Sequence, residues 1–341
     1  MKKDLKDLSL EELRVKLKAL GQPLYRAEQV FEWVYQKGAR NFGVMTDLPY
    51  SLRDSLNDKF KIISFEIVRK QVSRLDATRK YLFRLDDGET VEAVLIPARN
   101  RRTVCLSSQV GCAFGCEFCA SGLMGLKRDL RCGEILEQAL GVLDDLNGER
   151  LTNIVMMGAG EPLANYDNVM KAISVLNSPY GFAIGARKIT ISTAGYVPGI
   201  KRFMKQEAQI ELSVSLHAAN DKIRSSLMPI NNKYPLFELM AACREYLKKK
   251  NRIITFEYVL IKDVNVSRED AKLLSDLLKG LSCKVNLIPF NKAHGLNFLP
   301  PSEKQVKEFQ LILTNHGINS TIRAQRGADI DAACGQLRLR V

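Results

Sequence analysis

Residues 103–122 read TVCLSSQVGCAFGCEFCASG, and this stretch decides how the rest of the chain is interpreted. It begins as a run typical of a buried strand and continues into a loop that holds Cys112, Cys116 and Cys119 in the spacing C-x3-C-x2-C. Clustered thiolates in a chain of this size indicate metal binding rather than a disulfide framework. Their usual metals are zinc and the iron of iron–sulfur clusters.

Two kinds of metal site compete for these cysteines. A structural zinc ion needs a fourth ligand, and Cys105, the nearest further cysteine, lies within the preceding strand. Three ligands leave one metal position open, which suits a 4Fe–4S cluster with one iron free for a small ligand. Gly111, Gly115 and Gly122 let the loop curl around such a bulky group. We therefore favour the cluster and keep zinc as the alternative.

The region from residue 99 to 341 predicts an α/β fold. Six strand-like runs alternate there with helical runs, including one long helical stretch over 221–249. Such alternation produces a parallel sheet covered by helices. Six units make a partial barrel, because a closed barrel of this kind has eight.

Two smaller regions precede the barrel. Residues 1–62 are amphipathic, with a capping box from Ser9 to Glu12, and predict a small helical accessory domain. Residues 63–98 hold three strand-like runs and an Asp-Asp-Gly turn at 86–88, so we expect an antiparallel β linker.

Charge and hydropathy limit the possible partners. The 341-residue chain carries a net charge of +13, which favours a polyanionic partner such as nucleic acid. No apolar run is long enough to span a membrane, so we expect no membrane partner. The first twenty residues alternate charge with leucine and lack the apolar core of a signal peptide. We therefore expect a cytoplasmic protein.

Polar residues at the ends of later strands outline a second part of the site. The segment GAGEPLANYDN at 158–168 has glycines that permit close backbone approach, and its Glu161 can accept a hydrogen bond from an ammonium group. Ser192, Ser215, His217 and Asn291 follow successive strands at the same edge. Each is an ordinary turn residue taken alone, but together they mark a ligand site.

A third segment, RGADIDAACGQLR at 326–338, contains Cys334. Two interpretations are open: a buried structural cysteine, or a two-thiol pair with Cys105 that is separate from the three loop cysteines. Cys132, Cys243 and Cys283 are isolated, and we interpret them as small buried hydrophobic residues.

The loop spacing after the first barrel strand resembles the radical-SAM superfamily, in which S-adenosylmethionine (SAM) chelates the open iron. Further motifs narrow the resemblance to the RlmN/Cfr family of ribosomal RNA adenine methyltransferases. It covers most of the chain from Glu92 to Leu337, and the helical start resembles that family's accessory domain. The motifs are CLSSQVGCAFGCEFCASG, GEPLANYDN, ISTAGYVPGI, SLHAAN, LMPIN, VNLIPFN and DIDAACGQL.

The resemblance implies a methyl-cysteine mechanism that consumes two SAM molecules. Cys334 takes a methyl group from the first SAM, and the radical made from the second abstracts hydrogen from that methyl group. The carbon radical adds to an adenine, Glu92 removes the ring proton, and Cys105 attacks Cys334 to release the methylated RNA. The implied SAM contacts are Gly160, Glu161, Ser192, Ser215, Leu216, His217 and Asn291.

The implied substrate is an adenosine in the peptidyl-transferase centre of 23S rRNA, methylated at C2, with tRNA as a further substrate. Methylation at C8, the resistance-conferring branch of the family, is the alternative. The implied electron donor is a flavodoxin or ferredoxin. We also expect basic residues beside the cluster loop to hold RNA phosphates, namely Arg101, Arg102, Lys127 and Arg128.

Two other classes of function compete with this interpretation. A radical-SAM enzyme acting on a small molecule or peptide keeps the cluster but gives Cys334 no role. A zinc-stabilised RNA-binding protein keeps the charge but leaves the GEP segment and the strand-end residues unexplained.

Overall fold

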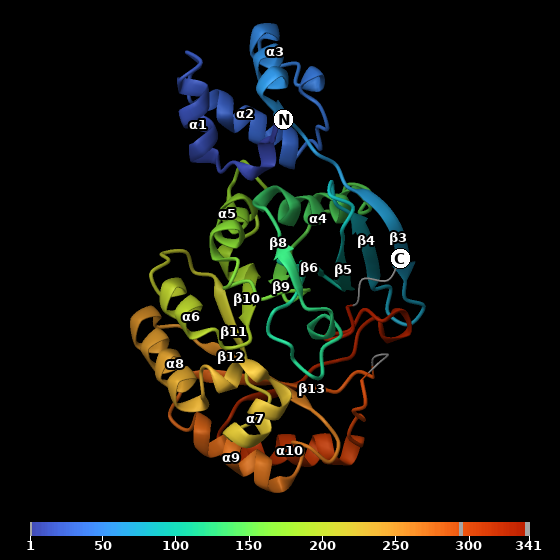
Figure 1. Ribbon diagram of the computed structural model, residues 1–341, viewed down its shortest axis with the longest axis vertical. Helices are drawn as coiled ribbons and strands as arrows, with labels where there is room; N and C mark the ends of the chain where they lie inside the picture. Colours follow the sequence, from blue (N-terminus) through green and yellow to red (C-terminus); the bar gives the residue numbers. More distant parts are fainter. Residues whose placement is uncertain (1, 293–295, 338–341) are drawn as a thin grey trace.

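A computed structural model describes residues 2–292 and 296–337. Figure 1 shows an elongated molecule with a small helical module at one end and a long twisted sheet through the rest. The module contains α1 (Leu10–Lys18), α2 (Tyr25–Tyr35) and α3 (Tyr50–Lys59). Its two ends are joined by a short parallel pair, β1 (Lys3–Asp4) and β2 (Phe60–Lys61).

The predicted capping box at the start of α1 is confirmed. The Ser9 hydroxyl accepts from the Glu12 amide at 3.1 Å, and the Glu12 carboxylate accepts from the Ser9 amide at 2.7 Å. The two bonds satisfy backbone donors that a helix start otherwise leaves unpaired.

The main sheet has ten strands in the order β14-β13-β12-β11-β10-β9-β6-β5-β4-β3. Seven of them run parallel and form the partial barrel. The two open edges of the whole ten-stranded sheet are β14 and β3. The parallel strands are β6 (Arg101–Cys105), β9 (Asn153–Met156), β10 (Ile189–Thr193), β11 (Glu211–Ser215), β12 (Ile254–Leu260), β13 (Cys283–Pro289) and β14 (Ser320–Ile322). The predicted partial barrel is therefore confirmed.

The antiparallel strands of the predicted linker belong to the same sheet. They are β3 (Glu66–Val72), β4 (Arg79–Arg84) and β5 (Thr90–Ala98), and β5 bonds directly to β6. Gly88, in the expected turn before β5, has a φ of +84°. Residues 63–98 thus extend the barrel sheet without a break.

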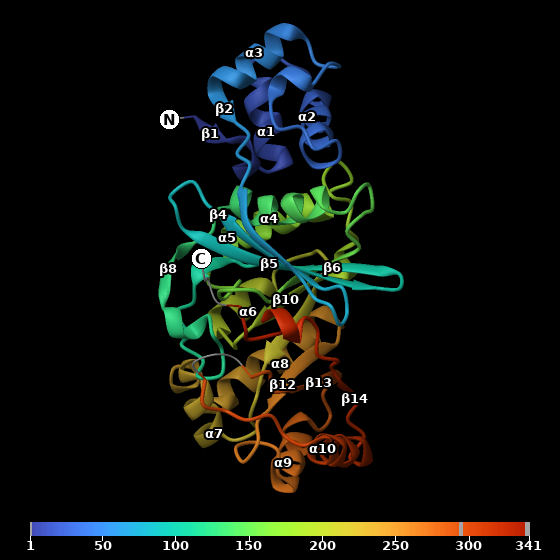
Figure 2. The ribbon, with the colours of Figure 1, turned by 90° about the vertical axis from the view of Figure 1, so that its right-hand side faces the viewer.

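Helices cover the outer face of the sheet, as Figure 2 shows for α4 and the C-terminal helices. The module packs over α4, which is why this helix is buried on almost every side from Cys132 to Val142. No helix among residues 2–292 and 296–337 has the length and apolarity to cross a membrane. The covering helices are α4 (Cys132–Asp144), α5 (Tyr166–Asn177), α6 (Val197–Phe203), α8 (Leu236–Lys250), α9 (Arg268–Leu278) and α10 (Glu303–Asn315).

Two details of the predicted elements are wrong. The single helix expected over 221–249 is broken into α7 (Asp221–Leu227), a 3₁₀ turn (Pro229–Asn232) and α8. Pro229 and Pro235 cause the breaks, because proline disfavours helical backbone in the residue before it and lacks an amide hydrogen.

The strand expected to run through to Val110 instead ends at Cys105. The chain then forms β7 (Gln109–Gly111), which pairs with β8 (Leu126–Asp129) in a separate hairpin. The last parallel strand, β14, was not predicted, since three residues are too few for a periodic pattern.

Candidate active site

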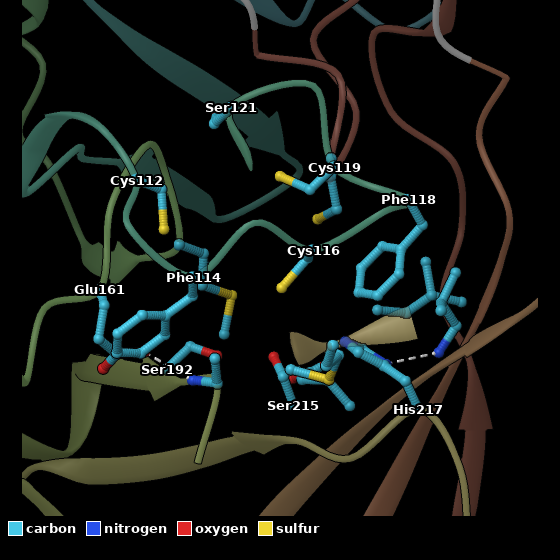
Figure 3. Close-up of a pocket in the computed structure, with 18 of the residues that line it drawn as sticks. Cys112, Phe114, Cys116, Phe118, Cys119, Ser121, Glu161, Ser192, Ser215 and His217 are labelled. Carbon is cyan, nitrogen blue, oxygen red and sulfur yellow. Dashed lines mark hydrogen bonds between the residues drawn. The ribbon is translucent and has the colours of Figure 1, made fainter. Parts of the chain in front are cut away.

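One cavity lies at the carboxyl ends of the parallel strands, where the loops after β7, β9, β10, β11 and β13 meet. Its wall includes Cys112, Cys116, Cys119 and the segment that carries Cys334. Figure 3 shows three of these cysteines above the cavity, with Ser192, Ser215 and His217 opposite them. The structure therefore brings together the three sequence segments that we singled out.

The cysteine loop closes the β7–β8 hairpin. The Cys112 amide donates to the Gly125 carbonyl at 3.0 Å, and the Cys119 amide donates to the Cys116 carbonyl at 3.1 Å. A β-carbon on Gly111, whose φ is +78°, would lie 1.9 Å from the Gly125 oxygen. Glycine is required there by both backbone conformation and space.

Two contacts fix the loop to distant parts of the chain. The Ala120 amide donates to the Gly335 carbonyl at 2.8 Å, which places the residue after Cys334 against the loop. The Glu117 amide donates to the Leu227 carbonyl at the end of α7 at 3.0 Å. The loop is thus held in one shape by the C-terminal segment and by α7.

The three loop thiols fit an iron–sulfur cluster. They come from one loop and face one cavity (Figure 3). Burial raises the pKa of the Cys112 thiol to about 11 and raises that of the Cys116 thiol well above its ordinary value, because a buried thiolate lacks solvation. A bound cationic metal centre supplies the charge that favours the thiolates. Among the described residues, no group of three or more His, Cys, Asp and Glu side chains is arranged around a single metal ion.

The GAGEP segment is packed tightly against the chain between β6 and β7. A β-carbon on Gly158 would lie 2.8 Å from the Leu106 carbonyl, and one on Gly160 would lie 2.6 Å from the Gln109 side chain. The Ser108 amide donates to the Ala159 carbonyl at 2.8 Å. The glycines therefore allow the close backbone approach that we expected, and the neighbour is the start of the cysteine loop.

Glu161 lines the cavity and also ties two strand ends together. Its carboxylate accepts from the Ala194 amide at 2.7 Å and from the Leu163 amide at 3.1 Å. Burial raises the pKa of this carboxyl to about 7, against these hydrogen bonds.

The strand-end residues are confirmed as neighbours. Ser192, Ser215, His217 and Asn291 all line the cavity. Leu216 differs: its side chain is fully buried in the core and does not line the cavity, so only its backbone belongs to this region.

His217 is a neutral polar group of the cavity wall. Its Nδ1 accepts from the Val259 amide at 3.0 Å, and the ring lies edge-on to Phe118 with centroids 4.7 Å apart. Burial, together with the Arg224 charge, lowers its pKa to about 3. A neutral ring that accepts at Nδ1 carries its proton at Nε2, which gives the site a hydrogen-bond donor.

Cys105 and Cys334 share a smaller pocket beside the main cavity. Cys105 is buried at the end of β6, whereas Cys334 is exposed and also lines the main cavity. Burial, and then the neighbouring Cys334, raise the pKa of Cys105 to about 12. The structure therefore favours the two-thiol interpretation over two unrelated cysteines.

Glu92 lies on β5, outside the residues that line the main cavity. It is buried, and its carboxylate lies 3.4 Å from the Lys80 ammonium. The same ammonium donates to the Asp331 carbonyl at 3.1 Å, three residues before Cys334. Lys80 thus connects Glu92 to the C-terminal segment.

Two arginines of the site were not predicted. Arg224 on α7 is fully buried and donates to the carbonyls of Leu216, Ala194 and Ser215. Arg323 follows β14, pairs with Glu257 at 3.7 Å, and has a pKa raised by the nearby Cys334. Arg323 was missed because β14 itself was missed, while Arg224 carries no sequence signal that separates it from a surface residue.

Matches to known proteins agree with this geometry. Residues 106–274 match the family model described as the radical SAM superfamily. Residues 3–62 match that of the ribosomal RNA large subunit methyltransferase N-terminal domain. The fold and the cysteine loop therefore define a radical-SAM enzyme.

Whole-chain similarity identifies the family. The chain is 47% identical over 335 residues to the "Probable dual-specificity RNA methyltransferase RlmN" of Caldanaerobacter subterraneus, covering 98% of this chain and 97% of the relative. Identity to the protein of the same name from Pelotomaculum thermopropionicum is 49%, with 99% and 92% coverage. The chain belongs to the RlmN family of radical-SAM methyltransferases.

A solved structure agrees. The crystal structure of a radical SAM methyltransferase from Sphaerobacter thermophilus superposes with a TM-score of 0.93 at 47% identity, covering 98% of this chain and 99% of that one. The cofactors of the chain are a 4Fe–4S cluster and SAM, as the family requires. The zinc alternative is therefore set aside.

Proposed function

We propose that the chain methylates C2 of an adenosine in the peptidyl-transferase centre of 23S rRNA and also acts on tRNA, in the cytoplasm, with a flavodoxin or ferredoxin as electron donor. The observation that carries the proposal is the pairing of Cys105 with Cys334 beside the cluster cavity. The names of the relatives support an RNA substrate. The RlmN name and the GEPLANYDN and DIDAACGQL segments favour C2 over C8.

Cys334 is the methyl acceptor in this proposal. It is the exposed member of the thiol pair and lies near Arg323, and both residues line the main cavity. The thiolate attacks the methyl carbon of SAM, forms an S–CH3 bond, and leaves S-adenosylhomocysteine. When bound, the cluster and a second SAM supply the 5′-deoxyadenosyl radical that makes this methyl group reactive.

The remaining steps belong to Glu92 and Cys105. After the methyl carbon has bonded to the adenine, the adduct gives up one electron, which the cluster would accept when bound, and Glu92 takes the ring proton. The C–S bond to Cys334 breaks as the Cys105 thiolate attacks the Cys334 sulfur, and the released methylene carbon takes a proton from water to become a methyl group. The methylated RNA then leaves and a Cys105–Cys334 disulfide remains. A dithiol reductant must then restore both thiols. We assign proposed SAM contacts to the strand-end side chains and to Gly160 and Glu161.

The test is Cys105→Ala in the cluster-loaded enzyme with SAM, a reductant and an rRNA fragment. Without the resolving thiol, the protein–RNA adduct on Cys334 should accumulate and migrate as one species on a denaturing gel. The matched control is Cys283→Ala, which removes a thiol at the start of β13, away from the pair. It should release free RNA, and mass spectrometry should show 2-methyladenosine.

Two results would contradict parts of this proposal. Free methylated RNA from Cys105→Ala at the rate of the unaltered enzyme would remove the two-thiol mechanism. Detection of 8-methyladenosine would place the chain in the other branch.

A further inference from the structure

A second cavity also reaches Cys334. Its wall contains residues at the amino ends of β6, β9 and β10, together with the segment from Arg323 to Arg326 and Cys334 itself. Cys112, Cys116 and Cys119, which line the first cavity, are not part of this wall. Cys334 therefore lines two cavities, and only one of them includes the cluster loop.

The two cavities differ in charge. Arg323 lines both, but the first also contains the carboxylates of Glu161 and Glu257. Among the described residues, the second is lined by no Asp or Glu side chain, but by Arg101, Lys188, Arg323 and Arg326. Such a wall favours a negatively charged ligand.

Three of these cations are exposed and, among the described residues, have no hydrogen-bonding or ionic partner for their side chains. We call Arg101, Lys188 and Arg326 the rim cations, because their side chains are exposed at the edge of the cavity. Within residues 2–292 and 296–337, none of them forms an ion pair or a side-chain hydrogen bond. Arg323 is different, since it pairs with Glu257.

The other basic residues expected to bind RNA are already occupied. Arg102 forms a two-pronged pair with Glu149, and the Lys127 ammonium lies 2.8 Å from both Glu89 oxygens. Arg128 pairs with Asp87 at 2.6 Å and with Glu134 at 2.8 Å. A cation paired with a protein carboxylate gains less from a phosphate, because the existing pair must be broken first.

We propose that the second cavity is the RNA entry site, in which the rim cations bind the phosphates that flank the target adenosine. This inference rests on the proposed function. The wall behind the rim includes Thr103 and Thr190, which are less exposed than the rim cations, and it ends at Cys334. A base must leave its stack to reach a catalytic group at the end of a cavity, and phosphate contacts fix its position.

An acidic electron-donor protein is the other kind of partner that a basic surface attracts. Such a donor has to approach the cluster, and the three cluster cysteines lie in the other cavity. The rim cations instead surround the route to the residue that bonds to the substrate. The position of the cavity therefore favours RNA.

The test compares two variants of the cluster-loaded enzyme. In one, Arg101, Lys188 and Arg326 are all replaced by Ala, and in the control, which also loses three positive charges, Arg102, Lys127 and Arg128 are replaced by Ala. Affinity for an rRNA hairpin is measured by fluorescence anisotropy at several salt concentrations. The rim variant should bind about tenfold or more weakly, with a plot of log affinity against log salt that is shallower by about 2, since each single-strand phosphate contact contributes about 0.7.

Further measurements separate this proposal from the proposed function. Methylation of Cys334 by SAM without RNA, read as the mass of the intact protein, should be unchanged in the rim variant. If the unaltered enzyme methylates RNA but the control loses more affinity than the rim variant, the entry site is wrong while the function stands. Unchanged RNA affinity with slower cluster reduction by flavodoxin would assign the rim to the electron donor and overturn the proposal.

Discussion

At the scale of single residues, the cysteine loop depends on space as much as on ligands. Gly111 and Gly122 both stand where a β-carbon would collide with backbone: 1.9 Å from the Gly125 oxygen in one case, 2.8 Å from the Cys116 nitrogen and oxygen in the other. Gly115 has a φ of +57° but nothing within 4 Å of its would-be β-carbon. The loop glycines are therefore not equivalent, although the sequence presents them alike.

This difference predicts unequal effects of alanine at two neighbouring positions. Gly111→Ala should open the β7–β8 hairpin and remove most of the iron and sulfide from the reconstituted protein. Gly115→Ala should only incur the left-handed backbone cost of about 1 kcal/mol and keep most of the cluster. Iron and sulfide per chain measure both. Equal loss in the two variants would show that backbone conformation, not the collision with Gly125, decides loading.

At the scale of elements, the short helix α7 joins the cysteine loop to the strand ends. Its last residue accepts from the Glu117 amide, and its Arg224 donates to carbonyls at the ends of β10 and β11. Arg224 has no carboxylate within ion-pair distance among the described residues, and its charge interacts with Cys116. A positive charge placed there stabilises the extra negative charge of a reduced cluster.

Arg224 is thus a positioning residue with an electrostatic effect, and the two roles can be separated. Arg224→Met should lower the reduction potential of the cluster, measured by redox titration with electron paramagnetic resonance. Arg224→Lys keeps the charge but loses the forked hydrogen bonds, so it should shift the potential less while weakening SAM binding. Equal potentials in Met and Lys variants would mean that the charge of Arg224 does not tune the cluster.

The same elements show which features of the fold and the site could be predicted from the sequence. Cysteine spacing and six alternating units predicted the partial barrel, because both depend on local patterns. The break at Pro229 and Pro235 was also visible in the sequence but was outweighed by the helical periodicity around it. Arg224 and Arg323 were out of reach, since their roles arise from residues distant in the chain. The sequence also did not separate the rim cations from Arg102, Lys127 and Arg128, because the difference is a nearby carboxylate, which local sequence does not report.

At the scale of the whole molecule, the helical module is fastened to the barrel by a buried ionic joint. Lys6 is fully buried, and its ammonium lies 2.5 Å from the Glu137 carboxylate on α4. Glu137 also pairs with Arg40 at 2.8 Å and accepts from the Phe65 amide at 3.2 Å. One carboxylate therefore holds the start of the module, its loop after α2 and the entry to the sheet.

The joint predicts an asymmetric response to removing either partner. Glu137→Gln removes the carboxylate that is hydrogen-bonded to the buried Lys6 ammonium and should lower the free energy of unfolding by about 3–5 kcal/mol. Lys6→Met should cost less, because Glu137 keeps Arg40. The chain has one tryptophan, Trp33 on α2, so urea unfolding followed by its fluorescence reports on the module itself. The double variant Lys6→Met, Glu137→Gln separates the two causes. If it is as unstable as Glu137→Gln alone, the loss of stability comes from the missing Arg40 and Phe65 contacts and not from the Lys6 ammonium left without Glu137.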